Sequence, residues 1–161
     1  MVCSGIPIVP RYVRVLNVVI RASTRPCDKV ESEDLDLTGF THLNFAFAFF
    51  HPTTFQMTDM DANAGRLYNR FTELKASKLS LKTWISVGGW SFNDETNIPN
   101  TRMAFSDMAS IAENRAKFIS SLVHFVSAYG FDGMDLDWEV SSASLVSGIT
   151  MAKKHRVPWS R

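Results

Sequence analysis

The stretch FDGMDLDWEV, residues 131–140, alternates carboxylates with bulky apolar side chains. In an extended strand every second side chain lies on the same face, so Asp135, Asp137 and Glu139 line up on one face about 6.6 Å apart. By the same alternation the acidic face also carries Phe131 and Gly133, and the opposite face carries Met134, Leu136 and Trp138. The pattern predicts a strand with one apolar face under covering helices and one acidic face.

Carboxylates in such a strand are costly, because each buried unpaired charge destabilises a fold by roughly several kcal/mol. They are expected to persist only where they perform chemistry or bind a metal. Neighbouring carboxylates also raise one another's proton affinity, so one of the three is expected to hold a proton near neutral pH. A protonated carboxyl beside ionised ones is what cleavage of a glycosidic bond requires. Glu139, the outermost acid with the longest side chain, is the predicted proton donor.

The rest of the chain alternates segments typical of strands with segments typical of helices. Strands are predicted at 11–20, 41–50, 81–89 and 131–140, and helices at about 63–79 and 101–129, the second ending at Gly130. Within 41–50, one face is expected to carry Leu43, Phe45, Phe47 and Phe49, and the other His42, Asn44, Ala46 and Ala48. This order predicts parallel β/α units and an α/β fold, with ligands at the carboxyl ends of the strands. Periodicity alone leaves an open doubly wound sheet and a closed barrel as alternatives.

The composition is that of one ordinary globular domain: 161 residues, 45% hydrophobic and 20% charged. The net charge of +1 hides a mildly acidic body, because basic but no acidic residues follow Glu139, and this argues against a nucleic-acid surface. No segment approaches the roughly 20 apolar residues of a membrane helix. No convincing secretion signal is found, since the apolar run at 15–20 is short and contains Asn17. A disulfide between Cys3 and Cys27 stays open, with two free thiols as the default.

Metal and nucleotide sites are disfavoured by residue spacing. A calcium loop counted from Asp135 would place Val140 where glycine is needed and Val146 where glutamate is needed. The segment TDMDANAG fails in the same way when counted from Asp59. The four histidines show no zinc spacing, and VGGW lacks the later glycine and the lysine of phosphate-binding loops. The sequence therefore predicts neither a metal nor a cofactor.

Two motifs resemble those of one known family. DGMDLDWE is similar to the DxxDxDxE signature of glycoside hydrolase family 18, the chitinases, and SVGG at 86–89 is similar to the SxGG motif of that family's third barrel strand. The segment at 25–50, which includes NFAFAFF, resembles secreted fungal class V chitinases, including those related to the killer toxin α subunit. The resemblance runs from about Arg25 to Glu139. It implies a TIM-type (β/α)8 barrel, of which about the first four β/α units are present.

The resemblance also implies an activity and roles for individual residues. The activity is retaining hydrolysis of β-1,4-linked N-acetylglucosamine polymers, with chitin or chito-oligosaccharide as partner and an extracellular location. Glu139 would be the general acid and base, Asp137 would orient the acetamido group that attacks the anomeric carbon, and Asp135 would share charge beneath it. Supporting residues would be Ser86, Gly88 and Asp132, and Gly89 and Trp90 would contact the sugar, although a core position for Trp90 fits the sequence equally.

Both ends of the chain depart from the family pattern. The chain divides into a divergent segment at 1–24 with a candidate first strand, a partial catalytic domain at 25–140, and a basic divergent tail at 141–161. Half a barrel leaves two unpaired strand edges and exposes the acids to water, so we expect impaired activity and self-association through these edges. The alternatives are a non-catalytic chitin-binding lectin and a non-enzymatic interaction fragment. Glu139 favours the enzyme, since lectins of the resembled family typically have lost this acid.

Overall fold

The computed structural model describes residues 14–19, 27, 30–94, 98–139 and 156–157. Its strands are β1 (Val15–Val19), β2 (His42–Phe50), β3 (Met57–Thr58), β4 (Lys82–Gly88), β5 (Gly133–Asp137) and β6 (Arg156–Val157). Its helices are α2 (Ala64–Glu73), α3 (Trp90–Asn93), α4 (Ala104–Ser110) and α5 (Ala112–Tyr129), with short 3-10 helices η1 (Ser32–Asp34) and η2 (Leu74–Ala76). Each of the four predicted strands contains an observed one, and β3 and β6 are additional.

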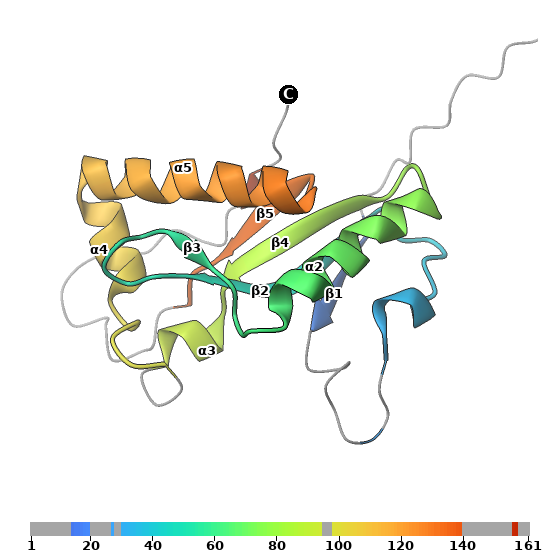
Figure 1. Ribbon diagram of the computed structural model, residues 1–161, viewed down its shortest axis with the longest axis horizontal. Helices are drawn as coiled ribbons and strands as arrows, with labels where there is room; N and C mark the ends of the chain where they lie inside the picture. Colours follow the sequence, from blue (N-terminus) through green and yellow to red (C-terminus); the bar gives the residue numbers. More distant parts are fainter. Residues whose placement is uncertain (1–13, 20–26, 28–29, 95–97, 140–155, 158–161) are drawn as a thin grey trace, which may run out of the picture.

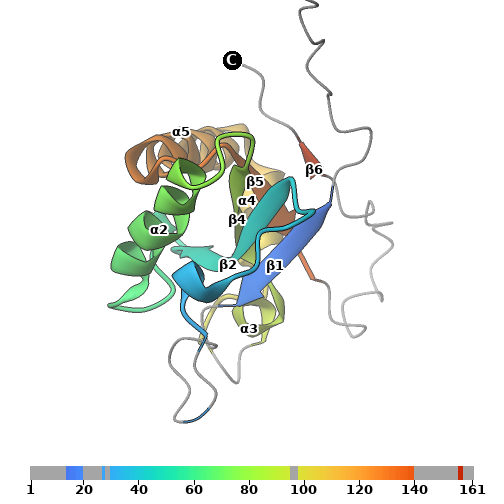
Figure 2. The ribbon, with the colours of Figure 1, turned by 90° about the vertical axis from the view of Figure 1, so that its right-hand side faces the viewer.

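The strands form one sheet whose central part is parallel. The order is β1-β2-β4-β5, all parallel, and β3 pairs antiparallel with β2 (Figure 1). The short strand β6 pairs antiparallel with β5 (Figure 2). The two long helices, α2 and α5, lie on the same side of the sheet (Figure 2). A doubly wound sheet would carry crossover helices on both faces. The arrangement is therefore that of part of a (β/α) barrel, with helices outside and the other sheet face inside.

Helix α2 covers the sheet through the apolar stripe that its sequence predicts. Leu67, Tyr68 and Phe71 are buried, and the Tyr68 and Phe71 rings contact the Phe45 ring of β2 with centroids 4.9 and 5.1 Å apart. The expected helix at 63–79 ends earlier, since α2 passes into η2 and Leu79 is 92% exposed. The stripe fixes which face of β2 lies under the helices.

The expected helix at 101–129 is two helices. Ile111 has φ −118° and ψ 135°, an extended conformation that separates α4 from α5. The last turn of α4 is closed by Ser110 Oγ and Arg115 Nη1, which donate to the Asp107 and Ala109 carbonyls at 2.9 and 2.6 Å. Gly130 ends α5 in the left-handed region, at φ 73° and ψ 24°, as predicted.

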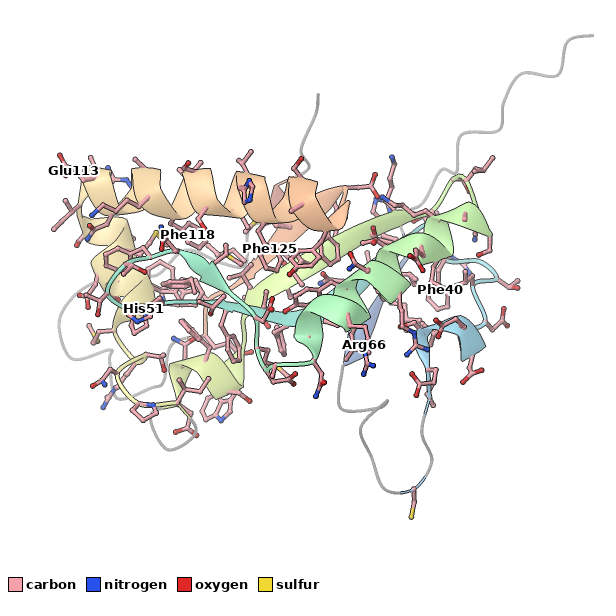
Figure 3. The ribbon with its side chains drawn as sticks, viewed as in Figure 1. Phe40, His51, Arg66, Glu113, Phe118 and Phe125 are labelled. Atoms are coloured by element: carbon pink, nitrogen blue, oxygen red, sulfur yellow. The ribbon has the colours of Figure 1, made fainter. Side chains whose placement is uncertain are left out.

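A second apolar cluster lies where α4 and α5 meet the end of β2. Phe118 and Phe125 of α5 point toward the sheet, while Glu113 points away from it (Figure 3). The Phe50 ring contacts the Phe105 and Phe118 rings with centroids 4.9 and 5.1 Å apart. These aromatic contacts fasten both helices to the outer face of the sheet.

Two alternation predictions are wrong. The register between β2 and β4 shifts between Ala46 and Ala48, so Ala48 joins Leu43 and Phe45 in the core under α2, a place expected for Phe47. A strand irregularity reverses the parity of the residues that follow it. Phe131 is not on the acidic face, because it precedes β5 and its ring packs near those of Tyr68 and Phe71.

Some predictions concern residues outside the described part of the chain. Of the segments at 1–24 and 141–161, only 14–19 and 156–157 are described, and β1 lies within the predicted first strand. Cys27 is a free, exposed thiol, and Cys3 is outside the described residues. No helix in the described ranges is long and apolar enough to cross a membrane.

Candidate active site

The acids of β5 lie on the inner face of the sheet. Asp135 and Asp137 are 4% and 8% exposed, and they alternate with Met134 and Leu136, which pack against the clusters under the helices. Trp138 also packs on the helix side, where its ring stacks on Phe105 with an interplanar angle of 16°. Two carboxylates are thus buried on the face away from the helices, at the carboxyl end of a parallel strand.

Glu139 follows the last residue of β5 by two positions and is half-buried. It is therefore at the rim of the inner face, more accessible than Asp135 and Asp137. A carboxyl that must reach a ligand from solvent needs such a position. Two buried acids on β5 are thus followed by one more accessible acid just beyond the strand.

Two glycines let β4 approach β5 closely. Gly88 is in register with Asp137 and has φ +105°, and a Cβ there would lie 2.7 Å from the Asp137 carbonyl oxygen and 2.7 Å from the Phe105 ring. Gly89 has φ +82°, its N–H donates to the Asp137 carbonyl at 2.8 Å, and a Cβ there would lie 2.7 Å from the Phe47 ring. Only glycine fits both positions without displacement.

Ser86 connects the two strands below these glycines. It is in register with Asp135, and its hydroxyl donates to Asp135 Oδ2 at 3.1 Å. Asn44 of β2, which the sequence did not mark as a site residue, donates from Nδ2 to Ser86 Oγ at 2.6 Å and to Asp135 Oδ2 at 3.2 Å. The available signal was an amide in the middle of an otherwise apolar strand.

Asp132 lies at the opposite end of β5 from the acidic rim. It accepts hydrogen bonds from Lys75 Nζ and Lys82 Nζ, both at 3.1 Å, and from the Thr83 N–H at 3.0 Å. Burial acts to raise the pKa of Asp132, but the Thr83 N–H and the two lysines outweigh it and hold that pKa below its usual range. Asp132 therefore ties β5 to β4 and η2 and is separate from the acids of the inner face.

Trp90 begins α3 and is 58% exposed. A core position for this side chain, one of the two readings of the sequence, is therefore wrong. The residue follows Gly89 directly, at the carboxyl end of β4. An exposed indole at that end of a strand is available to stack on a ligand.

His51 and the segment TDMDANAG make hydrogen bonds to nearby backbone groups. His51 Nδ1 accepts hydrogen bonds from the Thr53 and Thr54 N–H groups, both at 3.2 Å, within a turn after β2. Asp61 of TDMDANAG accepts from the Asn63 N–H at 2.8 Å, just before α2. The described part of the chain contains no group of three or more His, Cys, Asp or Glu side chains that could hold a metal ion.

A groove of about 900 Å³ lies on the outer side, between the turn after β2 and helix α5. Its lining residues are Thr53, Thr54, Gln56, Ala116, Lys117, Ser120, Ser121 and His124. None of the acids of β5 contributes to it. The acidic inner face and this outer groove are separate features.

Comparisons with known proteins show which family the sequence matches. The sequence profile of glycosyl hydrolases family 18 matches residues 21–155. Chitotriosidase-1 of Mus musculus is 38% identical over 106 residues, which are 66% of this chain and 21% of the mouse protein.

Solved structures give the same relationship. The immunomodulatory active chitinase TsES1 of Trichuris suis superposes with a TM-score of 0.70 at 34% identity, over 80% of this chain and 33% of that one. Human YKL-39, described as a pseudo-chitinase with retained chitooligosaccharide binding, superposes with a TM-score of 0.63 at 25% identity, over 77% of this chain and 32% of that one. The chain therefore spans about a third or less of the length of these proteins.

Proposed function

The chain belongs to glycosyl hydrolases family 18, and on that premise we propose that its acidic strand serves retaining hydrolysis of β-1,4-linked N-acetylglucosamine polymers. The observation that carries the proposal is the burial of Asp135 and Asp137 on the inner face of β5, followed by the more accessible Glu139 at the rim. Buried carboxylates at the carboxyl end of a barrel strand are typical of catalytic sites. The substrate class, chitin or chito-oligosaccharide, follows from the family.

The proposed reaction uses the substrate's own acetamido group as nucleophile. Glu139 donates its proton to the glycosidic oxygen as the bond from C1 to that oxygen breaks, and the acetamido oxygen forms a bond to C1. Asp137 orients the acetamido group and stabilises the positive charge of this cyclic intermediate, with Asp135 beneath it. Water then attacks C1 from the side the leaving group vacated, the bond from C1 to the acetamido oxygen breaks, and the water gives a proton to Glu139, so the configuration at C1 is retained.

Trp90 and Gly89 are the proposed sugar contacts. The exposure of Trp90 supports this role, because an apolar sugar face can stack on an accessible indole ring. Gly89 brings the backbone close to the Asp137 carbonyl, and its lack of a side chain leaves room for the Phe47 ring. Ser86, Gly88 and Asp132 support the site from β4 and from the start of β5.

A polypeptide of these 161 residues is proposed to be an impaired enzyme. Within the described residues β1 pairs with one strand, β2, and the outer edge of β5 is met by the two residues of β6. Asp135 and Asp137 are buried, but the more accessible Glu139 is more hydrated on an incompletely enclosed inner face than it would be in a closed barrel. Open edges also favour self-association. An extracellular location is proposed from the family.

The test is turnover of a chitotriose reporter by the purified chain, compared with Glu139→Gln and with Glu113→Gln, which removes an exposed carboxyl at the outer end of α5 (Figure 3). We expect weak turnover that Glu113→Gln retains and Glu139→Gln lowers by at least about a hundredfold. Equal turnover in the Glu139→Gln variant and the unchanged chain would overturn the catalytic role of Glu139. Turnover as fast as that of an intact family chitinase would overturn the proposed impairment.

The second candidate function is carbohydrate binding without hydrolysis. It is favoured by the similarity to human YKL-39, whose description combines retained chitooligosaccharide binding with the term pseudo-chitinase. Glu139 favours the enzyme instead, since the binding proteins typically have lost this acid. Retention of the chain on chitin beads without Glu139-dependent turnover would select the binding function, and neither retention nor turnover would select an interaction fragment.

A further inference from the structure

We propose that Asn44 is a positioning residue of the acidic face, which holds the Asp135 carboxylate in one orientation from across the sheet. The purpose of this arrangement rests on the proposed function, but its existence can be tested without any catalysis. Asn44 lies in the middle of β2 and is 2% exposed. It is not part of either sequence motif that marks the site.

Asn44 is the centre of a hydrogen-bonded row that crosses the four parallel strands. Its Nδ2 lies 3.2 Å from Asn17 Oδ1 of β1, 2.6 Å from Ser86 Oγ of β4 and 3.2 Å from Asp135 Oδ2 of β5. The Ser86 hydroxyl also donates to Asp135 Oδ2, at 3.1 Å. One oxygen of Asp135 therefore has two donors, from two different strands.

The direction of these hydrogen bonds is fixed by their chemistry. With the reverse amide orientation, the Asn44 oxygen would face the Asp135 carboxylate oxygen, and acceptor would oppose acceptor. The amide has two hydrogens for three acceptors, Asn17 Oδ1 on the β1 side of β2 and Ser86 Oγ and Asp135 Oδ2 on the β4 side, so at least two acceptors share one hydrogen. Donation runs from β2 toward β5 and ends on Asp135.

The consequence for Asp135 is a carboxylate held at one oxygen only. Within the described residues Asp135 Oδ1 is buried and has no hydrogen-bond partner, while Oδ2 carries both bonds. The two donors lock the carboxylate rotamer and leave Oδ1 as the oxygen that can accept from the next group along the face. Both donors are neutral groups, so the orientation does not depend on a titrating partner.

If position 44 served stability alone, an apolar side chain would suit it better than asparagine. Among the described atoms Asn44 Oδ1 is also buried without a partner, and an unsatisfied buried oxygen destabilises a fold. The flanking residues Leu43 and Phe45 are buried and apolar, and a similar residue at 44 would avoid that loss. Buried polar groups that lower stability occur mainly at functional sites. We therefore assign to the Asn44 amide the role of orienting Asp135.

The decisive experiment is the carboxyl ¹³C chemical shift of Asp135 in the full 161-residue chain. Asn44→Leu keeps the branched shape of the side chain and removes the donor, and it is expected to move the Asp135 signal while leaving the Asp132 signal in place. Asn69→Leu, on the exposed side of α2, is the matched control and should move neither. An unmoved Asp135 signal in Asn44→Leu would overturn the proposal.

If Asn44→Leu does not fold, the reciprocal measurement decides. Asp135→Asn keeps the shape and removes the charge, so the side-chain amide signals of Asn44 are expected to shift, and an unchanged Asn44 amide would reject the contact.

Where the chain turns over a chitotriose reporter, Asn44→Leu should lower kcat by about tenfold or more with little change in KM, because misplaced groups lose rate and not binding. An equal rise in KM with unchanged kcat would contradict positioning. A chain without turnover counts against the proposed function alone, since the chemical shifts are read independently.

Discussion

The carboxylates of residues 132–139 have two kinds of surroundings, although they are close in sequence. Asp132 faces two ammonium groups, Lys75 and Lys82, and a backbone N–H. Asp135 receives its hydrogen bonds from neutral groups, the Asn44 amide and the Ser86 hydroxyl. The charge of Asp132 is balanced by two lysines, and these contacts stabilise the fold. Asp135 is held by neutral donors and not by a cation in these hydrogen bonds, which suits it to chemistry.

The first prediction concerns Asp132 and pH. We expect Asp132→Asn to lower the free energy of unfolding by about 1–2 kcal/mol near neutral pH, because it removes the charge that both lysines contact. The pKa of Asp132 is lower in the folded chain, so its stabilisation is present above the unfolded pKa of about 3.9 and is lost as pH falls through the folded value. Urea unfolding from about pH 7 down to about pH 2 measures this.

The matched control for Asp132 is Glu73→Gln, which changes an exposed carboxyl on α2. It should alter the unfolding free energy little at any pH. The difference between Asp132→Asn and the unchanged chain should shrink toward zero at the acid end of the series. A difference that stays constant with pH would show that the loss comes from packing and not from the charge.

The alternation of side chains along a strand could predict which acids lie on the inner face. It could not predict which groups donate hydrogen bonds to them. Alternation in 131–140 correctly separated Asp135 and Asp137 from Met134 and Leu136, because β5 is regular over those residues. Asn44 was missed as a site residue because its role depends on which strands lie side by side and in what register. That information is absent from a single strand's pattern.

At the scale of elements, strands were easier to predict than their irregularities. The order of four parallel strands followed from apolar segments and helical periodicity, and all four are present. The shift at Phe47 and the break at Ile111 were not predicted, since both depend on packing against other elements. A stretch such as 101–129 has helical periodicity on both sides of Ile111, so one extended residue leaves no mark in the pattern.

The second prediction concerns the close approach of β4 to β5. We expect Gly88→Ala to destabilise the chain by more than about 3 kcal/mol, because the new Cβ would collide with the Asp137 backbone and the Phe105 ring in a left-handed conformation. Gly130→Ala is the matched control, since Gly130 also has positive φ but its nearest neighbour to a Cβ is Thr72 Oγ1 at 4.0 Å. Gly130→Ala should lower the free energy of unfolding by only about 1 kcal/mol.

Urea unfolding of both glycine variants separates backbone conformation from crowding. Equal losses would mean that the positive φ alone explains the need for Gly88. A larger loss for Gly88→Ala would locate the constraint in the contact between the two strands. If Gly88→Ala does not fold, its absence from the soluble fraction beside a folded Gly130→Ala supports the same conclusion.

At the scale of the molecule, the two sheet faces are unequal. The outer face is covered by α2 and α5, and Phe118 and Phe125 of α5 point toward it and belong to the two described core clusters (Figure 3). The inner face carries Asn17, Asn44, Ser86 and the acids. Since β1 pairs with β2 alone among the described strands, its other edge presents unpaired backbone groups.

The third prediction is that the polypeptide self-associates through this edge of β1. Val15→Lys places a charge on the edge strand, on the same face as Asn17 by alternation, and charged residues on edge strands oppose pairing with another chain. Sedimentation of the unchanged chain should show an average mass that rises with concentration, and Val15→Lys should lower it.

Ile119→Lys is the matched control, since Ile119 is a 53% exposed apolar residue on α5, away from the strand edges. If Ile119→Lys dissociates the assembly and Val15→Lys does not, association runs through the helix face and the edge plays no part. A chain that stays monomeric at all concentrations would contradict association by either route.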